Sequence, residues 1–195
     1  MPNPYIILGE YRDLITWVAI AASLASGLWV NYHGREIKER VGQSGILALE
    51  FTMNRKNANE VITNLAKPTP DPKTEQKQDD RDLRPLAAAN IWWDFLFIVA
   101  YVASTAFVCG YAAADNRGWW GAVLLALAWL QLAAGTLDVV ENGCMLRMLD
   151  STSVSTNLLP SVTTLCATLK FLIVFGGAGA GVPSAAVKLV GSCYK

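Results

Sequence analysis

Long apolar blocks separate the polar positions of this 195-residue chain, and four of these blocks are long enough for a helix to cross a bilayer. The first carries no charged side chain and the third stays uncharged from Gly118 to Leu137, while the second contains only Asp94 and the fourth only Lys170. About twenty helical residues cross the roughly 30 Å hydrocarbon core of a bilayer, and none of the blocks has the polar face that a helix in a soluble bundle needs. The pattern predicts an all-α, polytopic membrane protein with one membrane domain. We expect a four-transmembrane-helix up-down bundle with spans at about 14–32, 90–113, 118–140 and 158–181.

The long connection between the first two spans has two parts. Residues 34–66 carry apolar side chains at helical spacing, which predicts a cytoplasmic amphipathic helical insertion, and Asn57 followed by Glu60 suits a helix start with a capping box. Residues 67–85 have five basic and five acidic residues and almost nothing to bury, which predicts a polar tether. The amphipathic part is expected to lie on the membrane surface or to cap the bundle. The alternative is a lid over a membrane-embedded site.

Charge placement predicts an orientation. The connection between the first two spans holds ten of the sixteen basic residues, so we expect it in the cytoplasm, with both termini outside a cell (cytoplasmic or inner) membrane. Tryptophan pairs such as Trp92 with Trp93 and Trp119 with Trp120 open two spans, as in an aromatic belt. The formal net charge is zero, which argues against a nucleic-acid partner. The first apolar run exceeds a signal-peptide core and has no basic leader, so an uncleaved span is expected.

Polar residues follow one face of three spans, and ionisable groups within spans are costly in lipid and usually point inward. The faces contain Asn90, Asp94, Tyr101 and Thr105 on the second span, Gln131, Asp138, Glu141 and Asn142 on the third, and Thr163, Cys166, Lys170 and Gly177 on the fourth. We predict a ligand-binding site between these helices formed by Asp94, Tyr101, Gln131, Asp138, Glu141, Asn142 and Lys170.

Counting along the helices predicts two layers in this site. The carboxylates Asp94, Asp138 and Glu141 are placed at the cytoplasmic mouth, with Lys170, Gln131 and Tyr101 beneath them. The outer halves of the third and fourth spans carry no ionisable group, which argues against an open channel and favours a cavity open to the cytoplasm. Carboxylates are the ligands of hard cations, so a divalent cation bound by Asp94, Asp138 and Glu141, with Glu50, is a further hypothesis.

Structural explanations compete with this one. The carboxylates can simply end spans at the interface, and Lys170 can pair with a carboxylate for assembly alone. Small residues favour close helix packing, and a small-residue face on the first span favours a homo-oligomer or other membrane subunits as partners. These small residues are Gly176, Gly177, Gly179 and Gly181 on the fourth span, and Ala21, Ala22, Ala25 and Ser26 on the first.

Several chemistries find no support in the sequence. His33 is the only histidine, so no bis-histidine haem, histidine-rich zinc site or serine–histidine triad is expected. The four cysteines are too scattered for a zinc ribbon, although Cys109 and Cys193 are both placed near the outer side and a disulfide between them stays open. No cofactor is evident beyond the hypothetical divalent cation.

The segments ILALEFTMNRKNANEVITNL, WWDFLFIVAY, LDVVENGCMLRML and ATLKF are similar to those of small bacterial four-span integral membrane proteins without an assigned activity. This resemblance implies the four-span fold and brings no mechanism. Three functions remain. The first is a binding or transport protein with a cytoplasm-facing site for a cation, proton or small polar ligand. The alternatives are an accessory subunit of a larger membrane complex and a membrane-embedded enzyme that acts on a lipid substrate.

Overall fold

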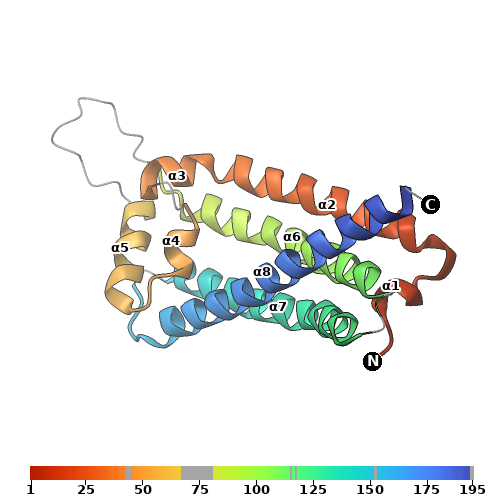
Figure 1. Ribbon diagram of the computed structural model, residues 1–195. Helices are drawn as coiled ribbons and strands as arrows, with labels where there is room; N and C mark the ends of the chain where they lie inside the picture. The colour runs from red at the N-terminus through yellow and green to blue at the C-terminus, as the bar shows by residue number, and fades with distance from the viewer. Residues whose placement is uncertain (43–44, 67–80, 115, 117, 152, 194–195) are drawn as a thin grey trace. The chain divides into compact units, whose positions relative to one another are not determined.

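The computed structural model describes residues 1–42, 45–66, 81–114, 116, 118–151 and 153–193 (Figure 1). Every regular element in this part of the chain is helical, which confirms the all-α prediction. The elements are α1 (Pro4–Ile7), the 3-10 helix η1 (Gly9–Tyr11), α2 (Arg12–His33), α3 (Arg35–Val41), α4 (Leu47–Glu50), α5 (Arg55–Ala66), α6 (Arg84–Ala113), α7 (Trp119–Asp150) and α8 (Leu158–Cys193).

Four helical segments are long and apolar enough to cross a membrane: Gly9–His33, Arg84–Ala113, Trp119–Asp150 and Leu158–Val190. The predicted membrane-helix bundle is therefore confirmed. The helices run past the expected spans, since α6 begins at Arg84 rather than residue 90 and α7 continues to Asp150 rather than 140. Most of the predicted tether, residues 67–80, lies outside the described residues.

The chain divides into two compact units. Unit 1 contains Met1–Gly27, Leu96–Asp138 and Thr168–Lys195, and unit 2 contains Leu28–Phe95 and Val139–Ala167. The long helices α2, α6, α7 and α8 each contribute residues to both units. We describe each unit by itself.

Contacts in unit 1 fix the directions of its helices. Trp120 of α7 donates a hydrogen bond to Ser184 of α8 at 3.1 Å, whereas Lys170 of α8 bonds to Asp138 of α7 at 2.6 Å. The residue number on α7 rises from 120 to 138 while that of its partner on α8 falls from 184 to 170, so these two helices are antiparallel. On α6, Cys109 bonds to the Gly177 carbonyl at 3.3 Å and Tyr111 accepts from Lys188 at 2.9 Å, so α6 and α8 run in the same direction. This is the order expected of an up-down bundle.

Small residues of α8 permit close approach in unit 1. A Cβ atom added at Gly181 would lie 2.7 Å from the Cys109 sulfur, and one added at Gly177 would collide with the Gln131 amide. Gly179, by contrast, has nothing within 4 Å of such an atom. The predicted packing role therefore holds for Gly177 and Gly181, while Gly179 faces outward.

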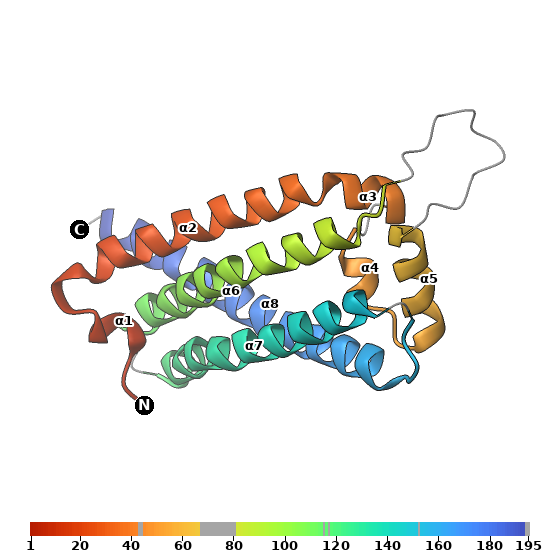
Figure 2. The same cartoon turned by 180° about the vertical axis from the view of Figure 1, so that it is seen from behind.

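Unit 2 has an apolar core built by the short helices. Ile37 of α3, Leu49 of α4 and Leu65 of α5 are fully buried, together with Ile91 of α6 and Met148 of α7. Figures 1 and 2 both show α3, α4 and α5 gathered beside the start of α6. The short helices therefore pack on the ends of long helices within unit 2.

Two helix starts in unit 2 are defined by side-chain oxygens. Asn54 accepts the backbone N–H of Asn57 at 3.0 Å, so Asn54 caps α5 and the predicted cap at Asn57 is wrong. The error arose because both positions carry asparagine and the Glu60 spacing favoured the second.

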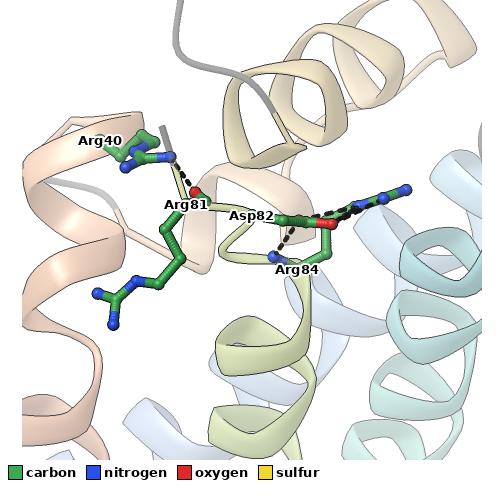
Figure 3. Close-up of polar contacts among 4 residues, drawn as sticks. All are labelled: Arg40, Arg81, Asp82 and Arg84. Carbon is green, nitrogen blue, oxygen red and sulfur yellow. Dashed lines mark hydrogen bonds and ion pairs between the residues drawn. The ribbon is translucent and has the colours of Figure 1, made fainter. Parts of the chain in front are cut away.

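The start of α6 is fixed by Asp82 (Figure 3). Its carboxylate accepts the Arg84 backbone N–H at 2.9 Å and the Arg84 guanidinium at 2.8 Å. Hydrogen bonding from Arg84 lowers the pKa of Asp82. Nearby, the guanidinium of Arg40 donates to the Arg81 carbonyl at 2.6 Å, which links α3 to the residues before α6.

Candidate functional site: a buried tyrosine–aspartate–lysine cluster

The polar faces of the long helices point inward. Gln131, Asp138, Glu141 and Asn142 of α7 are each 0–3% exposed, whereas Leu132 and Val139 beside them are 54% and 47% exposed. The same holds on α8, where Lys170 is buried and Leu172 is exposed. Helices with polar faces inside and apolar faces outside suit a lipid surrounding, and they concentrate the ionisable groups in the interior.

Three predicted site residues meet in unit 1, and we call them the Tyr–Asp–Lys cluster: Tyr101 of α6, Asp138 of α7 and Lys170 of α8. One carboxylate oxygen of Asp138 accepts from Lys170 Nζ at 2.6 Å, and the other accepts from the Tyr101 hydroxyl at 2.7 Å. The side chains of Lys170 and Asp138 are 8% and 5% exposed. Both oxygens of the carboxylate are thus bound, so its charge is stabilised without water.

The cluster corrects the predicted layering. Asp138 was expected at the mouth of the site, with Lys170 and Tyr101 in a deeper layer, yet the three groups are in direct contact. The prediction measured depth at the helix axis and ended the third span near residue 140. The long side chains of lysine and tyrosine reach several ångströms along the helix, and α7 continues for three further turns to Asp150.

Gln131 forms a second polar position on α7, two helical turns before Asp138. Its amide nitrogen donates to the carbonyls of Leu127 at 3.2 Å and Ile173 at 3.3 Å, which fixes the orientation of the amide. Its amide oxygen is buried and accepts no hydrogen bond from any described residue. A buried acceptor without a donor costs about 1–3 kcal/mol. The oxygen is therefore a position where a water molecule or a polar ligand would gain a hydrogen bond.

Two other predicted residues meet in unit 2. Asn142 of α7 donates to a carboxylate oxygen of Asp94 of α6 at 2.8 Å, and Asn90, one turn before Asp94, is 3% exposed. Glu141 and Glu50 are also buried in this unit, and the Glu50 carbonyl accepts from Thr164 of α8 at 3.0 Å. The Asn142 amide thus gives the Asp94 carboxylate a neutral donor.

The predicted ligand set is divided between the units. Tyr101, Gln131, Asp138 and Lys170 belong to unit 1, and Asp94, Glu141 and Asn142 belong to unit 2. No three Asp, Glu, His or Cys side chains in the described ranges come together in a way that could hold a metal ion. The divalent-cation site stays a prediction from the sequence. Cys109 is a free thiol, and the side chain of Cys193, its predicted partner, lies outside the part of the chain that the structure describes.

A cavity of about 1120 Å³ in unit 1 was not anticipated from the sequence. It lies between the first half of α2 and the last turns of α6 and α8, and its lining includes Arg12, Tyr5, Tyr111 and Lys188. The feature of the sequence that could have predicted this cavity is the placement of basic and aromatic residues at the ends of apolar runs. It was overlooked because α8 was expected to end at residue 181, before Lys188.

Comparisons of the chain with protein-family models, with curated proteins and with solved structures found no match. The geometry of the two units is therefore the only basis for assigning a function.

Proposed function

We propose that this chain is an integral membrane transport protein in which the Asp138 carboxylate binds a small monovalent cation in exchange for a proton. The observation that carries the proposal is the ion pair between Asp138 and Lys170, closed on its second oxygen by Tyr101 and buried within unit 1. Ionisable residues inside membrane helices are costly, and in functional membrane proteins they mark ion and proton pathways. The cytoplasm-facing site and the outside termini remain part of this proposal.

The exchange follows from charge balance. The Asp138 carboxylate contacts the Lys170 ammonium directly, and a cation that binds to this carboxylate displaces the ammonium. With the lysine still protonated, the bound cation and the ammonium together carry two positive charges against one carboxylate. The excess positive charge is unfavourable in the low-dielectric interior. Loss of one proton from Lys170 restores the balance, so one cation enters as one proton leaves. Tyr101 keeps its hydrogen bond to the other carboxylate oxygen and holds the side chain in place.

The test is transport by the purified protein in liposomes loaded with a pH-sensitive dye. A sodium or potassium gradient should drive proton movement in the opposite direction, and Asp138→Asn should abolish it. Asp150→Asn is the matched control, because Asp150 is an exposed carboxylate at the end of the same helix. Unchanged transport by Asp138→Asn, or no cation-dependent proton movement by the wild type, would reject the proposal.

An accessory-subunit function is the second candidate, and one observation favours it. Only 6% of the apolar window of the first candidate span is buried within the chain, against 50% for the second. The small residues Ala21, Ala22 and Ala25 are all exposed on this helix, which leaves room for a second copy or another membrane subunit. Purification in mild detergent distinguishes the two: stoichiometric companion proteins support a subunit, and a stable lone species supports the transport protein.

A further inference from the structure

The cavity of unit 1 has apolar walls along most of its length. Trp17, Ile20 and Leu24 of α2 and Val182 of α8 contribute apolar surface. Two hydroxyl groups in the lining are already satisfied, since Thr16 donates to the Arg12 carbonyl at 2.7 Å and Ser104 donates to the Tyr101 carbonyl at 3.0 Å. A ligand inside the cavity therefore meets a surface that favours hydrocarbon.

The lining is different at the end formed by the start of α2 and the end of α8, because two cations lie there on tyrosine rings. Arg12 lies 5.2 Å from the Tyr5 ring centroid, and Lys188 lies 4.1 Å from that of Tyr111. The two rings pack edge to face with centroids 5.4 Å apart, so the four residues form one cluster. Among the described residues that line the cavity, Asp13 is the single acidic one, and its carboxylate accepts a hydrogen bond from the Tyr5 hydroxyl. Two cations against one carboxylate give the described residues at this end of the cavity a net positive charge.

The positions of these groups along the helices match a lipid. Arg12 and Lys188 lie close to the ends of the candidate spans Gly9–His33 and Leu158–Val190, the level at which lipid headgroups sit. Leu24 lies twelve residues beyond Arg12, which is roughly 18 Å along α2 at 1.5 Å per residue. The apolar part of the cavity thus runs inward from a cationic end, as an acyl chain runs inward from its headgroup.

We propose that this cavity binds an anionic phospholipid, with an acyl chain between α2, α6 and α8 and the phosphate beside Arg12 and Lys188. The volume of about 1120 Å³ lies just above the usual range for a small-molecule site and accommodates an acyl chain. Basic pockets between membrane helices recognise anionic headgroups in this way. A neutral headgroup would gain nothing from the two cations, so the site discriminates by charge.

The test uses the full-length protein, delipidated in detergent and titrated with lipid under native mass spectrometry. Phosphatidylglycerol is compared with phosphatidylcholine of the same acyl chains. We expect tighter binding of phosphatidylglycerol, and Arg12→Gln or Lys188→Gln should each weaken it about fivefold. Arg147→Gln is the matched control, because Arg147 is an exposed arginine of unit 2 and should leave binding unchanged.

A second variant tests the apolar part of the cavity. Ala178→Phe places a ring in the lining of the cavity and should lower the occupancy of both lipids, while helicity and elution volume stay unchanged. Equal binding of the two lipids, or a loss in Arg147→Gln as large as in Arg12→Gln, would overturn the proposal. Full lipid occupancy in Ala178→Phe would also overturn it. Failure of Arg12→Gln to fold leaves Lys188→Gln and Ala178→Phe as independent tests.

Discussion

The buried pair of Asp138 and Lys170 shows how one carboxylate organises three helices. Asp138 lies on α7, and its two partners, Lys170 and Tyr101, lie on α8 and α6, so the carboxylate and the ammonium neutralise each other in a buried position. A buried pair adds little net stability compared with apolar residues of the same size, but removing one partner leaves a charge with no compensation. Single and double variants separate the net contribution of the pair from the cost of leaving one charge unpaired.

Lys170→Met should therefore destabilise the protein more than the double variant Asp138→Asn/Lys170→Met. We expect the single change to lower the free energy of unfolding by about 3–5 kcal/mol and the second change to recover most of that loss. Denaturant unfolding in a fixed detergent measures both. A double variant no more stable than Lys170→Met would show that the charges are not coupled.

Tyr5 provides a prediction about pH. Burial raises the pKa of Tyr5 to about 12, and the hydrogen bond to Asp13 adds to the shift. The unfolded chain ionises this phenol near pH 10, so the stability that Tyr5 contributes is full below pH 10, falls as the pH rises, and is lost above about 12. The ultraviolet titration of the wild type minus that of Tyr5→Phe should have a midpoint near pH 12. A midpoint near pH 10 would contradict the buried contact.

The residues that face inward were predictable from the sequence, because polar side chains in apolar helices recur at helical spacing. Gln131, Asp138, Glu141 and Asn142 were all identified in this way and are all buried. Which residues pair could not be predicted, since the pairs depend on how far one helix is shifted along the next. The contact of Asp138 with Lys170, and of Asp94 with Asn142, required the structure.

At the scale of elements, close packing of α8 depends on particular glycines. Gly181→Ala places a methyl group 2.7 Å from the Cys109 sulfur and should lower the stability by about 1–3 kcal/mol. Gly179→Ala adds a methyl group in open space on the same helix and should be neutral or stabilising. Thermal unfolding of the two variants in one detergent measures the difference. Equal stability of the two would contradict the close approach of α6 and α8 in unit 1.

Two asparagines at the start of α5, Asn54 and Asn57, allow a matched test of the helix cap. Asn54→Ala removes the acceptor of the first-turn hydrogen bond and should cost about 1 kcal/mol, whereas Asn57→Ala leaves that bond intact because Asn57 donates through its backbone. Denaturant unfolding followed by circular dichroism tests this. A larger loss in Asn57→Ala would favour Asn57 as the cap.

Helix boundaries were predicted less well than helix existence. Apolar runs identified the four long helices. The runs end at flanking charged residues, whereas α6 and α7 include such residues and extend beyond the expected spans. The extra turns of α6 and α7 carry buried side chains such as Ala87, Met145 and Met148, which pack with α3, α4 and α5 in unit 2. Tertiary packing therefore extends the helices past the boundary that hydropathy indicates.

At the scale of the whole molecule, the interiors of the two units differ in composition. Unit 2 is closed by an apolar cluster that includes the short helices, whereas unit 1 places an ion pair, a buried glutamine and a large cavity among its helices. Four helices with exposed apolar faces fit a protein surrounded by lipid.

The central claim is that a cation exchanges for a proton at Asp138, and the most direct measurement is proton release on cation binding. Sodium or potassium chloride is added to the purified protein in weakly buffered detergent solution, and an indicator dye reports the pH. The account predicts saturable release approaching one proton per chain from the wild type and from Asp150→Asn, and none from Asp138→Asn. No release from the wild type, or equal release from Asp138→Asn, would contradict it.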